Sequence, residues 1–257
     1  MLLLLDIGNT HTHLGLASGN RVTRQTNIPT ADWFLGPARR AVSAFVGLKP
    51  VRGAALCSVV PGVTPLAHRT VETLWETPCL ELNARTVKGV GIDYPKPSTI
   101  GPDRLANAIA ASHHFGAPCI VVDFGTAVTF DVVDARGHYT GGIIAPGLSA
   151  MTEYLHERTA LLPRIRIREV DSPIGKSTEQ AMLVGAVHGY RGLIRELLLE
   201  LRKELGVKKM PVVATGGYAA LIAARLPEIT AVDPLITLEG LRLWWQTQQT
   251  GEERPGR

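Results

Sequence analysis

The same short pattern occurs twice in this chain, and it constrains the fold more than any other feature. Residues 2–16 read LLLLDIGNTHTHLGL, and residues 119–133 read CIVVDFGTAVTFDVV. Each copy has an apolar strand, an Asp-x-Gly turn, a threonine and a second strand. Such a duplication predicts two related halves that face a cleft. We place these halves at residues 1–116 and 117–250, and we expect the polar tail, residues 251–257, to fray.

Strands and helices alternate along the rest of the chain. The expected strands are residues 2–5, 13–17, 51–60, 119–122, 129–133, 139–144 and 212–214. The expected helices are residues 31–45, 63–75, 104–115, 179–205 and 238–245. The arginines that alternate in LPRIRIRE, residues 162–169, are typical of a strand with one solvated face. This order predicts an α/β fold with a largely parallel sheet and antiparallel hairpins.

Composition excludes several classes of protein. With 45% hydrophobic and 19% charged residues, the 257-residue chain can bury a core. Its first residues lack the positive charge and the long apolar run of a signal peptide, and no run comes near the ~18 apolar residues of a membrane span. We therefore expect a cytoplasmic protein without membrane contact. Three cysteines without a CxxC pair indicate neither a zinc site nor a disulfide framework. A net charge of +4 without runs of like charge suits small anionic ligands better than nucleic acid.

The first Asp-x-Gly turn, residues 6–10, directly follows an apolar strand. An ordinary β-turn is one interpretation, because Asp, Gly and Asn all favour turns. In α/β sheets, however, ligands bind where strands end. There the turn's N–H groups and the Thr10 hydroxyl can bind a phosphate, and Asp6 can hold Mg²⁺. The second copy, residues 123–126, favours the phosphate interpretation, because two such turns can clamp a polyphosphate from both sides.

The sequence GPDR, residues 101–104, opens an expected helix. Pro102 suits the first helical position, which puts Asp103 in the first turn. Asp103 could compensate the helix dipole, or it could be a general base beside an arginine that binds an anionic substrate. Spacing alone leaves both open. The dipole and Arg104 should both lower the pKa of Asp103.

Three further patterns carry less information. GKST, residues 175–178, ends like a Walker A loop, but Val170 stands where that motif needs glycine. We expect a helix start there instead, capped by Ser177 and Gln180. The glycines at 216–217 indicate either a close approach to a nucleotide or a plain strand-to-helix turn. The eight histidines form no HExxH motif.

At these motifs the chain resembles the type III pantothenate kinases, members of the acetate and sugar kinase and actin superfamily. The segments that carry the resemblance are DIGNTHTHLGL (6–16), GPDR (101–104), DFGTAVT (123–129), GGIIAPG (141–147) and ATGGYAALI (214–222). They follow the family's order over nearly the whole chain. The resemblance implies two duplicated ribonuclease H-like halves, as in actin-like ATPases. It also implies transfer of the ATP γ-phosphate to pantothenate, the first step toward coenzyme A.

The same resemblance implies roles for single residues. ATP would contact Asp6, Ile7, Gly8, Asn9, Thr10, His11, Thr12, His13 and Thr126. Asp103 would be the general base, and pantothenate would contact Tyr94, Gly101, Pro102, Asp103, Arg104 and Thr178. Asp123 would bind a monovalent cation, K⁺ or NH₄⁺, and the reaction would also need Mg²⁺. Proline at position 102, where many relatives have alanine, suits a helix start.

Two other functions remain open at this point. One is a kinase of the same superfamily that acts on another small alcohol or acid. The other is a non-enzymatic regulator that binds nucleic acid through its positive charge, although the intact Asp6, Asp103 and Asp123 argue against it. Relatives form dimers through the second half, so we also expect a homodimer. The apolar residues within 181–199 and 241–245 are its expected contacts.

Overall fold

The structure is a computed structural model that describes residues 1–249, so the tail expected to fray lies outside the described residues. Contacts divide the chain into two compact units. Unit 1 comprises Met1–His114, Gly137–Thr140 and the chain from Leu235 on. Unit 2 comprises Phe115–Arg136 and Gly141–Pro234. Two segments of the expected second half, 117–250, therefore group with unit 1.

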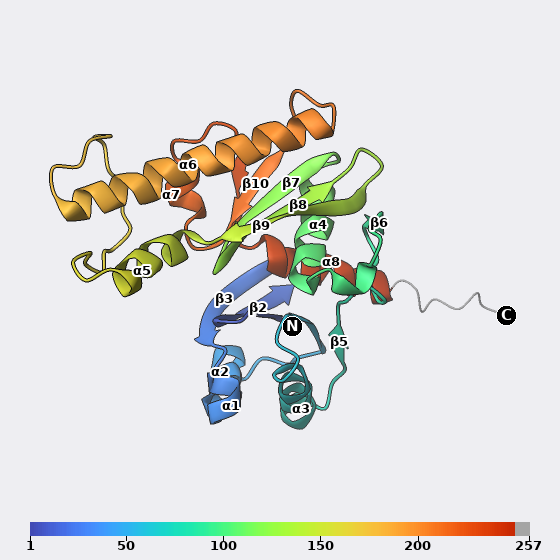
Figure 1. Ribbon diagram of the computed structural model, residues 1–257. Helices are drawn as coiled ribbons and strands as arrows, with labels where there is room; N and C mark the ends of the chain where they lie inside the picture. Colours follow the sequence, from blue (N-terminus) through green and yellow to red (C-terminus); the bar gives the residue numbers. More distant parts are fainter. Residues whose placement is uncertain (250–257) are drawn as a thin grey trace. The chain divides into compact units, whose positions relative to one another are not determined.

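Unit 1 is built on a five-stranded sheet, whose strands β2 and β3 are blue in Figure 1. The strands are β1 (Leu2–Ile7), β2 (His11–Ser18), β3 (Arg21–Pro29), β4 (Gly53–Ser58) and β5 (Cys79–Glu81), in the order β3-β2-β1-β4-β5. β1 pairs antiparallel with β2 and parallel with β4. The expected hairpin is therefore confirmed. β3 was not expected, because it is a polar edge strand with few buried residues.

The helices of unit 1 are α1 (Asp32–Leu35), α2 (Pro37–Val46), α3 (Thr64–Trp75), α4 (Pro102–Phe115) and α8 (Ile236–Gln249). The short elements β6 (Gly91–Ile92) and η1 (Pro97–Thr99) precede α4. The single helix expected at 31–45 is two helices, because Gly36 ends the first with a φ of 100°. Leu3, Leu5 and Ile7 of β1 are buried in one cluster with α1, α2 and α3. Since strand side chains alternate, Asp6 lies on the opposite face of β1.

That opposite face of the first sheet is covered by α8. Leu238 contacts Gly15 of β2, where an added Cβ would sit 3.1 Å from the leucine side chain. Gly240 touches α4 so closely that an added Cβ would overlap the carbonyl oxygen of Ala106. Only glycine allows this approach of the two helices. These contacts explain why the terminal helix groups with unit 1.

Unit 2 repeats the topology of the first sheet. Its strands are β7 (Cys119–Phe124), β8 (Ala127–Val133), β9 (His138–Pro146), β10 (Val212–Thr215) and β11 (Ala231–Val232). Their order, β9-β8-β7-β10-β11, corresponds to β3-β2-β1-β4-β5, and β7 pairs antiparallel with β8 and parallel with β10. The predicted duplication is therefore confirmed at the level of topology. β9 begins in unit 1, where its first residues pair with β6.

The helices of unit 2 are α5 (Leu148–Arg158), α6 (Thr178–Glu204) and α7 (Ala219–Ala223). Tyr190, Ile194 and Leu198 of α6 are buried in a core with β7, β8 and β10. α5 was not expected, because it buries only two residues. The strand expected at 162–169 is wrong: exposed arginines alternate with half-buried isoleucines, but the segment has no regular secondary structure. Within residues 1–249, none of the helices has the length and apolar character needed to cross a bilayer.

Candidate active-site residues

The first Asp-x-Gly turn joins β1 to β2 at the carboxyl end of β1. The N–H of Gly8 donates to the carbonyl of His11 at 3.0 Å, which closes the turn. Asn9, Thr10 and His11 are exposed at its tip. The turn thus offers its polar groups at the carboxyl ends of the strands, where α/β folds bind ligands.

Two of the expected ATP contacts do not face outward. The side chains of Ile7 and Thr12 are fully buried, and Thr12 Oγ1 accepts a hydrogen bond from Trp33 Nε1 at 3.0 Å. Only the backbone of these two residues is available to a ligand. His13 is half-buried on β2, and its Nδ1 lies 2.7 Å from Asn27 Oδ1 on β3. The motif alone does not show which of its side chains are buried and which are accessible, because that depends on which face of each strand packs against the core.

Asp6 has a second carboxylate for a neighbour. It lies on the α8 face of β1, and Asp103 of α4 acts on it electrostatically. Burial, and secondarily repulsion from Asp103, raises the pKa of Asp6 to about 7. Cys57, which pairs with Asp6 in the parallel register of β1 and β4, donates its thiol to Asp6 Oδ1 at 3.4 Å. No sequence motif marks Cys57, and it is the β1–β4 register that places it beside Asp6.

Asp103 stands in the first turn of α4, which begins at Pro102 as predicted. Its Oδ1 accepts the backbone N–H of Arg104 at 2.9 Å. The predicted lowering of its pKa is wrong. Burial outweighs the hydrogen bond and the charge of Arg104, so the pKa of Asp103 is raised. A raised pKa makes this carboxylate a stronger base than the sequence indicated.

Arg104 and Tyr94 both contact a residue that no motif singled out, Tyr139. The guanidinium carbon of Arg104 lies 5.7 Å from the centre of the Tyr139 ring, within range of a cation–π interaction. The ring of Tyr94 lies 6.2 Å from the same ring. Tyr139 is buried, whereas Tyr94 is exposed. From the sequence, Tyr139 is predictable only as a strand residue, because its contacts arise from the pairing of distant segments.

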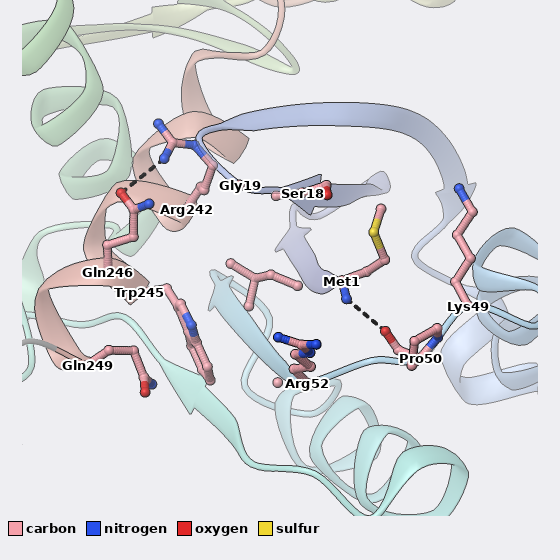
Figure 2. A pocket seen from close by; sticks show the side chains of 13 residues that line it. Met1, Ser18, Gly19, Lys49, Pro50, Arg52, Arg242, Trp245, Gln246 and Gln249 are labelled. Atoms are coloured by element: carbon pink, nitrogen blue, oxygen red, sulfur yellow. Dashed lines mark hydrogen bonds between the residues drawn. The ribbon is translucent and has the colours of Figure 1, made fainter.

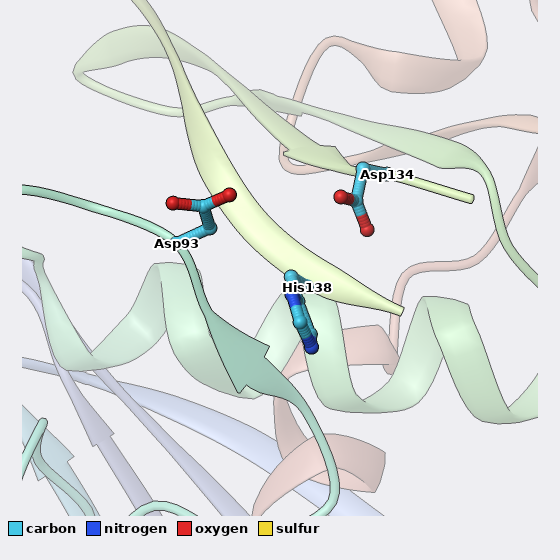
Figure 3. A group of neighbouring side chains, drawn as sticks. All are labelled: Asp93, Asp134 and His138. Atoms are coloured by element: carbon cyan, nitrogen blue, oxygen red, sulfur yellow. The ribbon is translucent and has the colours of Figure 1, made fainter. Parts of the chain in front are cut away.

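The pairing of β6 with β9 holds these aromatic side chains in place. The N–H of Asp93 donates to the carbonyl of Tyr139 at 2.9 Å. Figure 3 shows the side chains of Asp93 and His138 on these two paired segments. Asp134, also drawn there, belongs to unit 2, where it accepts a hydrogen bond from Arg136 Nε at 2.8 Å. The β6–β9 pairing therefore fixes the position of Tyr139, against which Tyr94 and Arg104 pack.

Unit 2 carries the second Asp-x-Gly turn, between β7 and β8. The N–H of Gly125 donates to the carbonyl of Ala127 at 3.1 Å, and Gly125 and Thr126 are exposed. Gly216, which follows β10, has a φ of 88°, and an added Cβ would lie 2.6 Å from Asp123 Oδ1. Glycine is therefore needed for the chain to turn beside this carboxylate. The glycines at 216–217 make a strand-to-helix turn that is also a close approach to Asp123.

Thr178 is the exposed first residue of α6. The expected cap is confirmed, because Ser177 Oγ accepts the N–H of Gln180 at 3.2 Å. Gln180 Oε1 in turn accepts the N–H of Lys176 at 2.8 Å. The expected site residues are thus divided between the units. Unit 1 links Asp6, Asp103, Arg104 and Tyr94, and unit 2 holds Asp123, Thr126 and Thr178.

A cavity of about 1010 Å³ lies at the opposite end of the strands, where β1 and β4 begin. Its lining includes Met1, Arg52 and Trp245, at the starts of β1 and β4 and on α8 (Figure 2). The amine of Met1 donates to the carbonyl of Pro50 at 2.7 Å. Because Asp6 stands near the opposite end of β1, this cavity is separate from the site that the motifs predict.

Comparisons with known proteins agree with the motifs. The family model for type III pantothenate kinase matches residues 2–200. A type III pantothenate kinase of Akkermansia muciniphila is 47% identical over 242 residues, which is 94% of this chain and 96% of the relative. One from Methylacidiphilum infernorum is 42% identical over 247 residues, which is 94% of this chain and 87% of the relative.

Solved structures share the fold at lower identity. A conserved Baf family protein from Campylobacter jejuni has a TM-score of 0.64 at 18% identity, and the match covers 96% of this chain and 99% of that one. Component A of (R)-2-hydroxyglutaryl-CoA dehydratase from Acidaminococcus fermentans has a TM-score of 0.51 at 15% identity, over 98% and 99%. Fold, motifs and sequence identity over almost the whole length agree, and the chain belongs to the type III pantothenate kinase family.

Proposed function

We propose that this chain transfers the γ-phosphate of ATP to the primary hydroxyl of pantothenate. The observation that carries the proposal is the pair of Asp6 and Asp103. A turn suited to phosphate and a half-buried carboxylate with a raised pKa are neighbours in unit 1. Phosphoryl transfer requires a phosphate site and an acceptor-activating group together.

Asp103 is the proposed general base. Its carboxylate accepts the hydroxyl proton of pantothenate while the hydroxyl oxygen bonds to the γ-phosphorus. The bond from that phosphorus to the β,γ-bridging oxygen breaks, and ADP leaves. Because the transition state is loose, positioning contributes more than proton abstraction. The exposed turns at residues 9–11 and 125–126 are the proposed contacts of the ATP phosphates.

The carboxylates suit the cations that we propose for the reaction. Mg²⁺ prefers oxygen ligands, and Asp6 and Asp103 repel each other unless a proton or a cation offsets their charges. Asp6 would hold Mg²⁺, which when bound neutralises charge on the phosphates. Asp123 would hold a monovalent cation, since its carboxylate offers an oxygen ligand beside the second turn. The chain's own residues bind the phosphates, orient pantothenate and accept the proton.

A phosphotransfer assay tests the proposal directly. With ATP labelled at the γ-phosphate, we expect label on pantothenate and none on a panel of other hydroxy acids and sugars. Preferred transfer to another member of the panel would identify a different kinase of the superfamily. Absence of transfer to any acceptor, with Mg²⁺ and K⁺ present, would contradict a kinase function.

We also propose that the enzyme acts in the cytoplasm. Its three cysteines are free thiols, and two of them are buried. Free thiols are typical of proteins in a reducing compartment.

Arg104→Ala should raise KM for pantothenate about ten- to a hundredfold and leave KM for ATP nearly unchanged. Loss of a charge-assisted hydrogen bond costs about 1.5–3 kcal/mol, and the Tyr139 ring holds Arg104 next to Asp103, where a substrate carboxylate can reach it. Steady-state kinetics with each substrate varied in turn measure both constants. Arg69→Ala, at an exposed position of α3 in the same unit, is the control. If the Arg104 variant loses ATP affinity instead, Arg104 binds the phosphates.

Activity should require a monovalent cation in addition to Mg²⁺. A cation at Asp123 would offset repulsion between that carboxylate and the incoming phosphates. We expect higher rates in K⁺ or NH₄⁺ than in Na⁺ at constant ionic strength. Asp123→Asn should reduce this difference. Equal rates of the wild type in potassium and in sodium-only buffers would count against the assignment.

Most of the apolar side chains first expected to form a dimer are already buried within their own unit. Leu241 and Trp244 of α8 are buried in unit 1, and most apolar residues of α6 pack on the core of unit 2, although Leu199 is exposed. Most of the exposed large apolar side chains of unit 2 lie elsewhere, on β9, on α5 and in the segment before α6. They include Ile144 (67% exposed), Tyr154 (62%), Leu161 (90%) and Ile174 (72%).

We propose that these exposed residues form the contact of a homodimer. Light scattering at micromolar concentration should give twice the chain mass of 27.7 kDa. Replacing Tyr154 and Leu161 by aspartate should shift the mass toward that of one chain, because burying two unpaired charges is costly. A wild-type mass of one chain would contradict the dimer.

A further inference from the structure

A buried threonine holds the first Asp-x-Gly turn from behind. Thr30, directly after β3, is 2% exposed and lies outside every motif of the sequence. Its Oγ1 donates to the carbonyl of Gly8 at 2.7 Å, and its backbone N–H donates to the carbonyl of Thr10 at 3.0 Å. One residue therefore fixes the carbonyls on both sides of Asn9.

The side-chain hydrogen bonds behind the turn run in one direction. The indole N–H of Trp33 can only donate, so Thr12 Oγ1 is the acceptor of their 3.0 Å bond. The single hydroxyl proton of Thr30 is used on Gly8, so in the 3.1 Å contact between the two threonines Thr12 donates and Thr30 accepts. All three side chains are buried, where such chains of hydrogen bonds reinforce one another.

This arrangement sets the direction of the turn's N–H groups. A trans peptide is planar, with its N–H opposite its carbonyl. With the Gly8 carbonyl held toward Thr30, the N–H of Asn9 points the other way, and the same holds for the Thr10 carbonyl and the N–H of His11. N–H groups attract a phosphate, whereas carbonyl oxygens repel it. Rotation of either peptide would break a hydrogen bond to Thr30.

We infer that Thr30 is a positioning residue for ATP, which acts through the turn at residues 8–11 without touching the nucleotide itself. The inference rests on the proposed function, in which this turn binds the phosphates. The hydroxyl of Thr30 therefore affects the binding of ATP and does not affect the binding of pantothenate.

Thr30→Val tests the inference, because valine keeps the shape of threonine and removes the hydroxyl. We expect KM for ATP to rise about tenfold, as for the loss of one buried hydrogen bond, with KM for pantothenate within about twofold of wild type. Thr30→Ser restores the hydroxyl and should return KM for ATP to within about threefold of wild type. An unchanged KM for ATP in Thr30→Val would overturn the inference.

Thr23→Val is the matched control. Thr23 Oγ1 donates to the carbonyl of Leu16 at 2.9 Å, so it makes the same kind of bond at the other end of the β2–β3 hairpin. The KM of the Thr23→Val variant for ATP should equal that of wild type. Thermal unfolding of each variant gives the second readout. If both valine variants lower Tm equally and neither changes KM for ATP, the role of Thr30 is structural only.

Binding of a non-hydrolysable ATP analogue, measured by calorimetry, separates this inference from the proposed function. If wild type phosphorylates pantothenate and Thr30→Val binds the analogue as tightly as wild type does, the inference is wrong and the function stands. If wild type does not phosphorylate pantothenate, the function is wrong, yet tenfold weaker analogue binding by Thr30→Val still supports the inference. Should Thr30→Val not fold, Trp33→Phe removes the first donor. It should weaken analogue binding about threefold, and unchanged binding would overturn the inference.

Discussion

Asp103→Asn should lower kcat by about two to four orders of magnitude and leave the fold intact. Asparagine has the shape of aspartate but cannot accept the substrate proton. Its side-chain oxygen can still accept the N–H of Arg104, so the start of α4 should keep its geometry. Steady-state kinetics give kcat, and circular dichroism with thermal unfolding reports the fold.

The alternative interpretation of Asp103, compensation of a helix dipole, has its own control. Asp32 is the first-turn acid of α1, and Asp32→Asn should change stability slightly and kcat hardly at all. If Asp103→Asn behaves like Asp32→Asn, with normal turnover, Asp103 has no part in the mechanism. The pH profile adds a further check. The acidic limb of kcat/KM in wild type should lie above the pKa of an ordinary aspartate, because burial raises the pKa of Asp103.

Asp6→Asn should abolish phosphotransfer and yet stabilise the metal-free protein at pH 8. A pKa of about 7 in place of 3.8 corresponds to about 4 kcal/mol against the charged form. Asp6 is only half-buried, so we expect about half of this, roughly 2 kcal/mol. The residue that would hold Mg²⁺ therefore weakens the fold that carries it.

The pH dependence of this effect has a definite sign. Between about pH 4 and 7, the folded protein keeps a proton on Asp6 that the unfolded chain has released. The contribution of Asp6 to stability is therefore present below pH 4 and is lost as the pH rises toward 7. Urea unfolding in EDTA at pH 5 and at pH 8 should show a larger advantage of the variant at pH 8. Equal advantages at the two pH values, or a less stable variant at pH 8, would contradict the raised pKa.

Local sequence patterns predicted the frame of both sheets. The repeated strand–turn–strand pattern marks β1–β2 and β7–β8, because alternation and turn residues are properties of a few neighbouring positions. Gly101 and Pro102 likewise predicted the start of α4 correctly. Elements with little apolar pattern, such as the edge strand β3, could not be predicted in this way.

The environment of the candidate site could not be predicted, because it depends on contacts between distant segments. The pKa of Asp103 is raised because the first turn of α4 is packed against other segments. This burial has a larger effect on the pKa than the charge of the neighbouring Arg104. Tyr139 joins Tyr94 only through the pairing of β6 with β9. Thr30 reaches Gly8 across a hairpin. None of these contacts has a spacing that a motif could show.

The position of α8 also bears on how the chain matures during translation. A nascent chain leaves the ribosome from its N-terminus, and domains usually fold in that order. Here the face of β1 that carries Asp6 is covered by Ile236–Gln249, which emerge after every strand of unit 2. The last strands made can therefore be in place before the first sheet is covered. A premature stop codon just before α8 would spare unit 2 and expose the half of the protein that was synthesised first.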